Sequence, residues 1–387
     1  MATPHHSVLC RALLALALLA MPAAAPVQAE TSSWIDRATD VAPATRKDKP
    51  LRLEKPAATR PARAAPPTAT GGDMPTSKLD GRPAGSDRGN VSSFAKTSPS
   101  SGATTPVSGE DAAYLAFDEG KYLTALDLAQ KAAKGGDPQA HTLIGRIYQE
   151  GLGVKRDAAT AAKWYARAAE LGDTEGQFAY GILLAEGEGV AKDRVAAGKM
   201  FEAAAMKGHA LANYNLALLF LRGDGKPENP YRAARHMRYA AEQGVVAAQY
   251  DLGTLYATGT GVDPNAFEAA KWIGRAAVAG NPEAELDFGV LLMRGQGVPV
   301  DQKRAISMLR AAAEKGVAVA QNRLARCYAY GLGVAADAGE AAKWNLIAKA
   351  SGLEDPALDK MVAKMARGDR LKAEQAASAW QDRAAFQ

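Results

Sequence analysis

The chain has 387 residues, of which 47% are hydrophobic, 23% charged and only 6% aromatic, and its formal net charge is +5. Two cysteines are too few for a disulfide scaffold or a four-cysteine zinc site, and so few aromatic residues argue against a row of stacking platforms for single-stranded nucleic acid. Residues 30–109 hold 12 Lys and Arg against 8 Asp and Glu, whereas residues 110–387 hold 34 of each. We therefore expect no basic nucleic-acid-binding face on the folded part, although a local patch can hide in a neutral total.

Residues 1–29 have the pattern of a secretory signal peptide. Arg11 precedes the apolar run ALLALALLAMPAAA, and Val27 and Ala29 place small residues before a cleavage point at Glu30. The run is too short and too rich in proline for a stable membrane span. We expect export, most simply to a bacterial periplasm, with at most peripheral membrane contact. An uncleaved anchor and a buried helix are the alternatives.

Residues 30–109 are expected to form an unfolded linker. They hold 10 of the 20 prolines and only two aromatic residues, Trp34 and Phe94. Such a segment buries too little apolar area to offset the entropy lost on folding. Ser93 and Lys96 match the Ser-x-x-Lys motif of penicillin-interacting enzymes, but no companion motif accompanies them.

A period of 36 residues dominates the rest of the chain. The glycines of a Gly-x-Gly pair recur without insertion at Gly151/Gly153, Gly187/Gly189, Gly223/Gly225, Gly259/Gly261, Gly295/Gly297 and Gly331/Gly333. An alanine column keeps the same step at Ala168, Ala204, Ala240, Ala276, Ala312 and Ala348. Six copies in register indicate a repeat architecture.

Each repeat is predicted to contain two helices. In the first repeat, one helix runs from about Gln139 to Glu150 and ends at Gly151, because glycine adopts the left-handed conformation that closes a helix. The second helix begins after Asp157, whose short side chain can accept from the free N–H groups of the first turn. The same column holds Asp193, Asn229, Asn265, Asp301 and Asp337.

The interior columns favour close packing of these helices. Small residues flank a column of mostly large side chains, which reads Trp164, Met200, His236, Trp272, Met308 and Trp344. One helix pair cannot bury both of its faces, so neighbouring repeats must stack. The sequence therefore predicts an all-α fold, a right-handed α-solenoid of six 36-residue helix-loop-helix repeats over residues 138–353. Helical caps are expected over 110–137 and 354–387.

The repeated pattern A-x-x-x-L-G-x-x-Y-x-x-G-x-G-V-x-x-D-x-x-x-A-x-x-W-x-x-x-A-A-x-x-G resembles the Sel-1-like repeat family, a relative of the tetratricopeptide repeat. The first copy carries it in Ala140, Gly145, Tyr148, Gly151, Gly153, Val154, Asp157, Ala161, Trp164, Ala168, Ala169 and Gly172. The third copy departs most, since Lys226 replaces the valine, and we expect its loop to differ in shape and to offer an insertion point for a partner. A cysteine-rich branch of the family is linked to penicillin binding, and this chain lacks those cysteines.

No set of residues predicts catalysis, a metal site or a cofactor. His141, His209 and His236 fall in three different columns without ligand spacing to one another. The Gly-x-Gly loops lack the preceding strand of a phosphate-binding loop. Cys327 lies in a column of Ile and Leu, so we expect a buried apolar side chain, with a redox or cross-linking role as the alternative.

Binding through a surface of the solenoid is the function that the sequence still supports. The resemblance to tetratricopeptide repeats implies that the first helix of each repeat lines a concave face that holds a protein or peptide. We expect partner contacts there from Phe178, Tyr214, Tyr250 and Asn322 of one column and from Arg146, Ile182, Leu218 and Arg326 of the next. The alternative is that these side chains only pack between neighbouring first helices.

The expected function is that of a non-enzymatic periplasmic scaffold or adaptor. The resemblance implies a partner such as an envelope sensor or assembly factor, because some exported members regulate envelope signalling or assembly. A penicillin-interacting or cell-wall hydrolase and a glycan-binding envelope protein are the alternatives.

Overall fold

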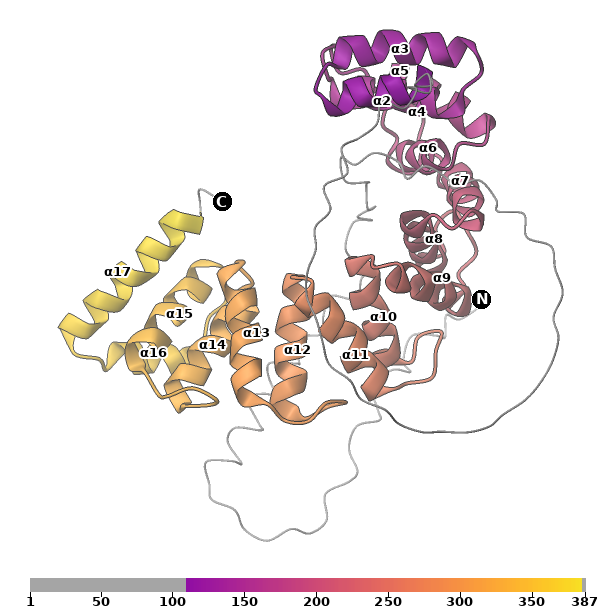
Figure 1. The fold of residues 1–387 in the computed structure, drawn as a ribbon. Coiled ribbons are helices and arrows are strands. Elements are labelled where there is room, and N and C mark those ends of the chain that lie inside the picture. The colour runs from indigo at the N-terminus through magenta and orange to yellow at the C-terminus, as the bar shows by residue number, and fades with distance from the viewer. Residues whose placement is uncertain (1–108, 385–387) are drawn as a thin grey trace, which may run out of the picture. The chain divides into compact units, whose positions relative to one another are not determined.

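The computed structural model describes residues 109–384, which form sixteen α-helices, α2–α17, and no β-strand. Figure 1 shows these helices following one another in antiparallel pairs along the chain. The expected all-α solenoid is therefore confirmed. The predicted signal peptide and linker, with Cys10 and the Ser93–Lys96 motif, lie outside the described residues.

Each of the six repeats has a first helix of 13 residues, called an inner helix below. The inner helices are α4 (Pro138–Glu150), α6 (Thr174–Glu186), α8 (Ala210–Arg222), α10 (Val246–Thr258), α12 (Pro282–Arg294) and α14 (Ala318–Tyr330). Inner helices of neighbouring repeats lie next to one another, as α4 does with α6. They also bond directly through side chains, for example Tyr214 of α8 with Asp251 of α10.

The second helix of each repeat, called an outer helix below, packs between its own inner helix and that of the next repeat. The outer helices are α5 (Ala158–Glu170), α7 (Arg194–Met206), α9 (Pro230–Glu242), α11 (Ala266–Val278), α13 (Gln302–Glu314) and α15 (Ala338–Ala350). All twelve helices are 13 residues long, so the 36-residue period is kept in space as well as in sequence.

Helix ends follow the predicted capping residues. Asp157 accepts a hydrogen bond from the Thr160 amide, and the other five members of its column accept in the same way at the start of their outer helices. Gly151 closes α4 with a left-handed φ of 70°, and the equivalent glycines close the other inner helices. These local rules set where each helix begins and ends.

The second glycine of each Gly-x-Gly pair touches the preceding repeat. A Cβ added to Gly261 would lie 2.0 Å from the carbonyl oxygen of Pro230, at the start of α9. Gly189, Gly225 and Gly297 lie equally close to the starts of α5, α7 and α11. Glycine is thus required twice at this position, for its positive φ and for the contact of two backbones.

The core between helices is built largely from alanine. The six alanines of the column that starts at Ala168 are all fully buried. Gly176 occupies a position that holds alanine in the other five repeats, and a Cβ added there would lie 2.5 Å from the Ala168 Cβ. Small residues let the helices approach, and large side chains such as Phe201 and Trp344 fill the space that remains.

The loop of the third repeat keeps the shape of the others, contrary to expectation. Gly223 and Gly225 have the same left-handed backbone, and Asn229 caps α9 as its equivalents do. The Lys226 side chain takes the place of the valine, since its stem lies against Gly198 while its Nζ donates to Glu202 at 2.6 Å. A long aliphatic stem with a paired charge can fill an apolar position.

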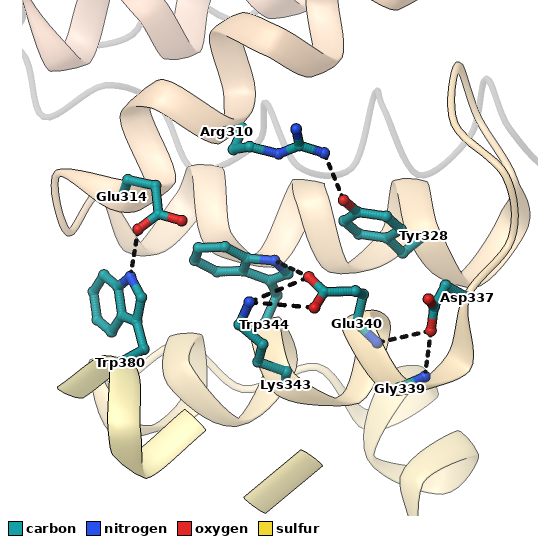
Figure 2. Close-up of polar contacts among 9 residues, drawn as sticks. All are labelled: Arg310, Glu314, Tyr328, Asp337, Gly339, Glu340, Lys343, Trp344 and Trp380. Atoms are coloured by element: carbon teal, nitrogen blue, oxygen red, sulfur yellow. Dashed lines mark hydrogen bonds and ion pairs between the residues drawn. The ribbon is translucent and has the colours of Figure 1, made fainter. Parts of the chain in front are cut away.

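Additional helices cover both ends of the stack. Helices α2 (Gly109–Asp118) and α3 (Tyr122–Lys134) pack before α4, and α16 (Pro356–Ala363) and α17 (Arg367–Ala384) pack on α15. Figure 2 shows Trp380 of α17 donating through Nε1 to Glu314 of α13, at 2.6 Å. The Trp380 ring also meets the edge of Trp344, so α17 closes the apolar end of the last repeat.

Candidate functional site

The inner helices present two side-chain columns that the sequence places on a concave wall, and a third column follows one turn further on. In the second and third repeats all but one of these side chains are buried, including Ile182, Ala185 and Leu218, whereas Leu221 is partly exposed. From the fourth repeat onward the wall opens, because Thr254, Val290 and further side chains of α10, α12 and α14 are only partly covered. The partly or fully exposed members in repeats four to six are Tyr250, Thr254, Ala257, Leu286, Val290, Met293, Arg326 and Ala329.

Five of the predicted contact residues are buried and not accessible to a partner. Phe178 is 0% exposed, stacks on the His209 ring at a centroid distance of 4.4 Å and also meets Phe201. Tyr214, Ile182, Leu218 and Asn322 are buried as well. The alternative raised from the sequence, packing between neighbouring helices, therefore describes these five side chains.

The predicted aromatic column instead forms a series of bonds between repeats. Tyr214 donates to Asp251 of the next inner helix at 3.0 Å, and Tyr250 donates to Asp287 at 2.8 Å. Each bond joins a column residue to a carboxylate of the following repeat. At the ends of the stack the column bonds instead to the N-cap carboxylate of a following helix, since Thr142 donates to Asp173 at 2.6 Å and Asn322 donates to Asp355 at 3.0 Å.

Sequence reasoning missed the carboxylates of this series. Asp251 and Asp287 follow the column by one position, 37 residues after the tyrosines that they bind. A tyrosine followed by an aspartate 37 residues later could therefore have been recognised in the sequence. Burial raises the pKa of Asp287, while the hydrogen bond from Tyr250 and the charge of Arg323 oppose that shift.

The two predicted arginines are held by bonds within the chain. Arg146 pairs with Glu150 at 2.8 Å and lies over the Phe117 ring. Arg326 pairs with Asp355 at 2.6 Å. Both side chains stay partly exposed. Partner contact at Arg146, Tyr250 and Arg326 remains a prediction.

Comparison with known proteins gives the family. The Sel1 repeat model matches residues 120–137, 138–173, 174–209, 210–245, 246–281, 282–317 and 318–352, which is more than half of the chain. The chain is a Sel1 repeat protein. The first of these matches is a partial one within the N-terminal cap, and the other six coincide with the repeats described above.

Two solved structures resemble this Sel1 repeat protein. One is a Sel1 repeat protein from Oxalobacter formigenes, with 30% identity, a TM-score of 0.55, and coverage of 62% of this chain and 96% of that one. The other is c5321, a protective antigen of uropathogenic Escherichia coli strains that displays an SLR fold, with 26% identity, a TM-score of 0.50, and coverage of 71% and 68%. A search of curated proteins finds no match. Sel1 repeat proteins generally act as protein–protein interaction scaffolds.

The histidines of the Sel1 repeats serve the helix framework. His209 caps α8 by accepting from the Ala212 amide and lies 3.1 Å from Glu175. The Nδ1 of His236 lies 2.9 Å from Asn213, and burial lowers the pKa of this imidazole. Within residues 109–384 no group of three or more His, Cys, Asp and Glu could hold a metal ion, and no helix has the length and apolar character to cross a bilayer.

Cys327 is fully buried in α14, and burial raises the pKa of its thiol to about 12. Because the thiolate is the reactive form, we expect the native protein to react with a maleimide at least about 100-fold more slowly than the unfolded protein. A Cys10→Ser variant restricts the measurement to Cys327, and mass spectrometry gives the labelled fraction over time. Native labelling at the rate of the urea-unfolded control would contradict burial and favour the redox alternative.

Proposed function

We propose that this Sel1 repeat protein is an exported, non-enzymatic scaffold that holds a segment of a partner protein against the inner helices of repeats four to six. One observation carries the proposal: the side chains of these inner-helix columns are buried in repeats two and three, apart from Leu221, and most of them are at least partly exposed from α10 onward. Apolar side chains there, Leu286, Val290 and Met293, stay partly exposed between the polar groups of Tyr250 and Arg326. An apolar strip with aromatic and arginine side chains at its edges matches the composition of interface centres.

The finer parts of the proposal come from the sequence. The signal-peptide pattern of residues 1–29 supports export to a periplasm, and the resemblance supports a partner among envelope sensors or assembly factors. Sel1 repeat solenoids are typically non-catalytic, which supports a binding role over a cell-wall hydrolase.

Site-specific photo-cross-linking tests the proposed surface. A benzoylphenylalanine at Thr254 or Val290 on the inner face is expected to trap one discrete protein in intact cells. The same residue at Lys199, exposed on outer helix α7, is the matched control and should trap none. Fractionation of the same cells locates the complex. Trapping from position 199 but not from 254 or 290 would overturn the inner-face site. Hydrolysis of a chromogenic β-lactam by the purified chain would favour the enzyme alternative.

A further inference from the structure

The outer helices of repeats three to five concentrate positive charge that the neutral total hides. Helices α9, α11 and α13 contain eight Lys and Arg but three Glu, a net of +5. The inner helices of the same repeats, α8, α10 and α12, contain two Arg against four Asp and Glu, a net of −2. The basic residues of these outer helices are Arg232, Arg235, Arg238, Lys271, Arg275, Lys303, Arg304 and Arg310.

The six arginines of this set are not neutralised within the described residues. All six are exposed, and none takes part in an ion pair of residues 109–384. Outer-helix arginines elsewhere behave differently, since Arg167 of α5 pairs with Glu170 and Arg194 of α7 pairs with Asp224. Among the six outer helices, the arginines that form no ion pair are thus confined to α9, α11 and α13.

Aromatic side chains hold five of these guanidinium groups in place. Arg275 lies over Trp272 at 4.6 Å from the ring centre, and Arg304 lies over Phe288 at 5.2 Å. Arg310 donates to the Tyr328 hydroxyl at 2.6 Å, as Figure 2 shows. A ring fixes the guanidinium plane without consuming its charge, so its donor edge stays available for a carboxylate. The other two are Arg232 over Phe220 and Arg238 over Tyr256.

Two exposed aromatic side chains accompany this charge. Tyr231 and Phe267 occupy the second position of α9 and α11, 36 residues apart, and are 76% and 64% exposed. Neighbouring repeats therefore carry the two rings at the same end of adjacent outer helices. Arginine and exposed aromatic side chains together are the residue types that dominate binding energy at protein interfaces.

We propose that the outer face of α9, α11 and α13, called the arginine face, binds an extended acidic segment of a partner protein that carries an apolar side chain. Charge complementarity selects an acidic partner, and the exposed rings select one with an apolar anchor. Glu242 and Glu268 lie among the arginines and would repel a uniform polyanion such as nucleic acid or an anionic bilayer. Residues 30–109 of this chain carry a net charge of +4 and cannot neutralise the face.

Fluorescence anisotropy with the full-length chain tests the proposal. The probe is a labelled 12-residue peptide of alternating Glu and Leu, compared with the same peptide in which Lys replaces Glu. We expect only the acidic peptide to bind, and its affinity to fall as salt rises. Arg232→Gln combined with Arg238→Gln should weaken binding by about tenfold or more, and Tyr231→Ala should weaken it by a similar factor.

Arg235→Glu supplies a variant that leaves the helix packing untouched, because Arg235 contacts no ring or carboxylate among the described residues. Its matched control is Lys163→Glu, at the same position of outer helix α5, which should leave binding unchanged. Binding that is equal in Arg235→Glu and Lys163→Glu overturns the proposal. So does preferential binding to phosphatidylglycerol vesicles, or self-association that Arg235→Glu abolishes. A Val290 variant should bind the peptide normally, since the two faces are independent.

Discussion

Gly261→Ala is expected to lower the free energy of unfolding by about 2–5 kcal/mol. Gly261 has a φ of 70°, and left-handed backbone costs a residue with a Cβ about 1–2 kcal/mol. The new Cβ would also lie 2.0 Å from the Pro230 carbonyl oxygen, so the loop must move off the start of α9. Displacing packed backbone adds about 1–3 kcal/mol. Urea denaturation followed by circular dichroism measures the total loss.

Gly244→Ala is the matched control for that substitution. Gly244 has a φ of 87°, but an added Cβ would meet no atom within 4 Å. Only the backbone cost of about 1–2 kcal/mol should remain. Because repeat arrays need not unfold in two states, hydrogen exchange at the junction of repeats three and four supplies a second readout. An equal loss in both variants would show that the contact between repeats contributes nothing.

The helices, their ends and their stacking could be predicted because local rules determine them. Gly151 ends α4 and Asp157 begins α5 through interactions within a few residues, and the 36-residue step repeats those interactions six times. The alanine column that starts at Ala168 is buried throughout for the same reason. The capping residues, the spacing of the small residues and the 36-residue repeat all indicated the same fold, so it could be predicted from the sequence.

The inner surface could not be predicted as well, because exposure depends on residues one repeat away. Phe178 and Tyr250 share a column, yet Phe178 lies beneath His209 while Tyr250 reaches Asp287 and stays partly exposed. Lys226 shows a similar effect. Lysine in place of valine predicts a loop of different shape, but Gly198 leaves room for its stem and Glu202 pairs with its charge, so the loop keeps its shape. The position within the repeat determines where the backbone of a residue lies, and the side chains of the neighbouring repeat determine whether its own side chain is exposed.

The basic outer face could not be predicted from the net charge of the folded part. The folded part has equal numbers of acidic and basic residues, which argued against a basic nucleic-acid-binding face and left only a local patch open. Sorting the helices into inner and outer layers separates those charges, because α9, α11 and α13 are basic while α10 and α12 are acidic. The two layers of a solenoid alternate along the chain, so a running average over the sequence cancels the difference.

Asp355→Ala is expected to cost about 3–5 kcal/mol of stability in the C-terminal cap. Asp355 is 2% exposed, caps α16 through the Ala357 amide, and accepts from both Asn322 and Arg326. Removing the buried carboxylate takes an ion pair from Arg326 and a hydrogen bond from the buried Asn322 amide, and breaking a buried pair is costly. Asp369→Ala is the control, since its pair with Lys372 is exposed and should be worth about 1 kcal/mol or less. Hydrogen exchange of α16 and α17 reports the difference, and similar losses in the two variants would contradict it.

The contribution of Asp355 should also depend on pH with a definite sign. Burial alone would raise the pKa of this carboxyl, but the hydrogen bonds from Asn322 and Arg326 outweigh burial and lower the pKa below its usual 3.8. A carboxyl with a lowered folded pKa stabilises the fold above its unfolded value and loses that effect as pH falls through the folded value. The stability gap between wild type and Asp355→Asn should therefore be constant from pH 7 to about 5 and shrink below about 4. A gap that stays unchanged in acid would mean that Asp355 acts through its shape and hydrogen bonds rather than through its charge.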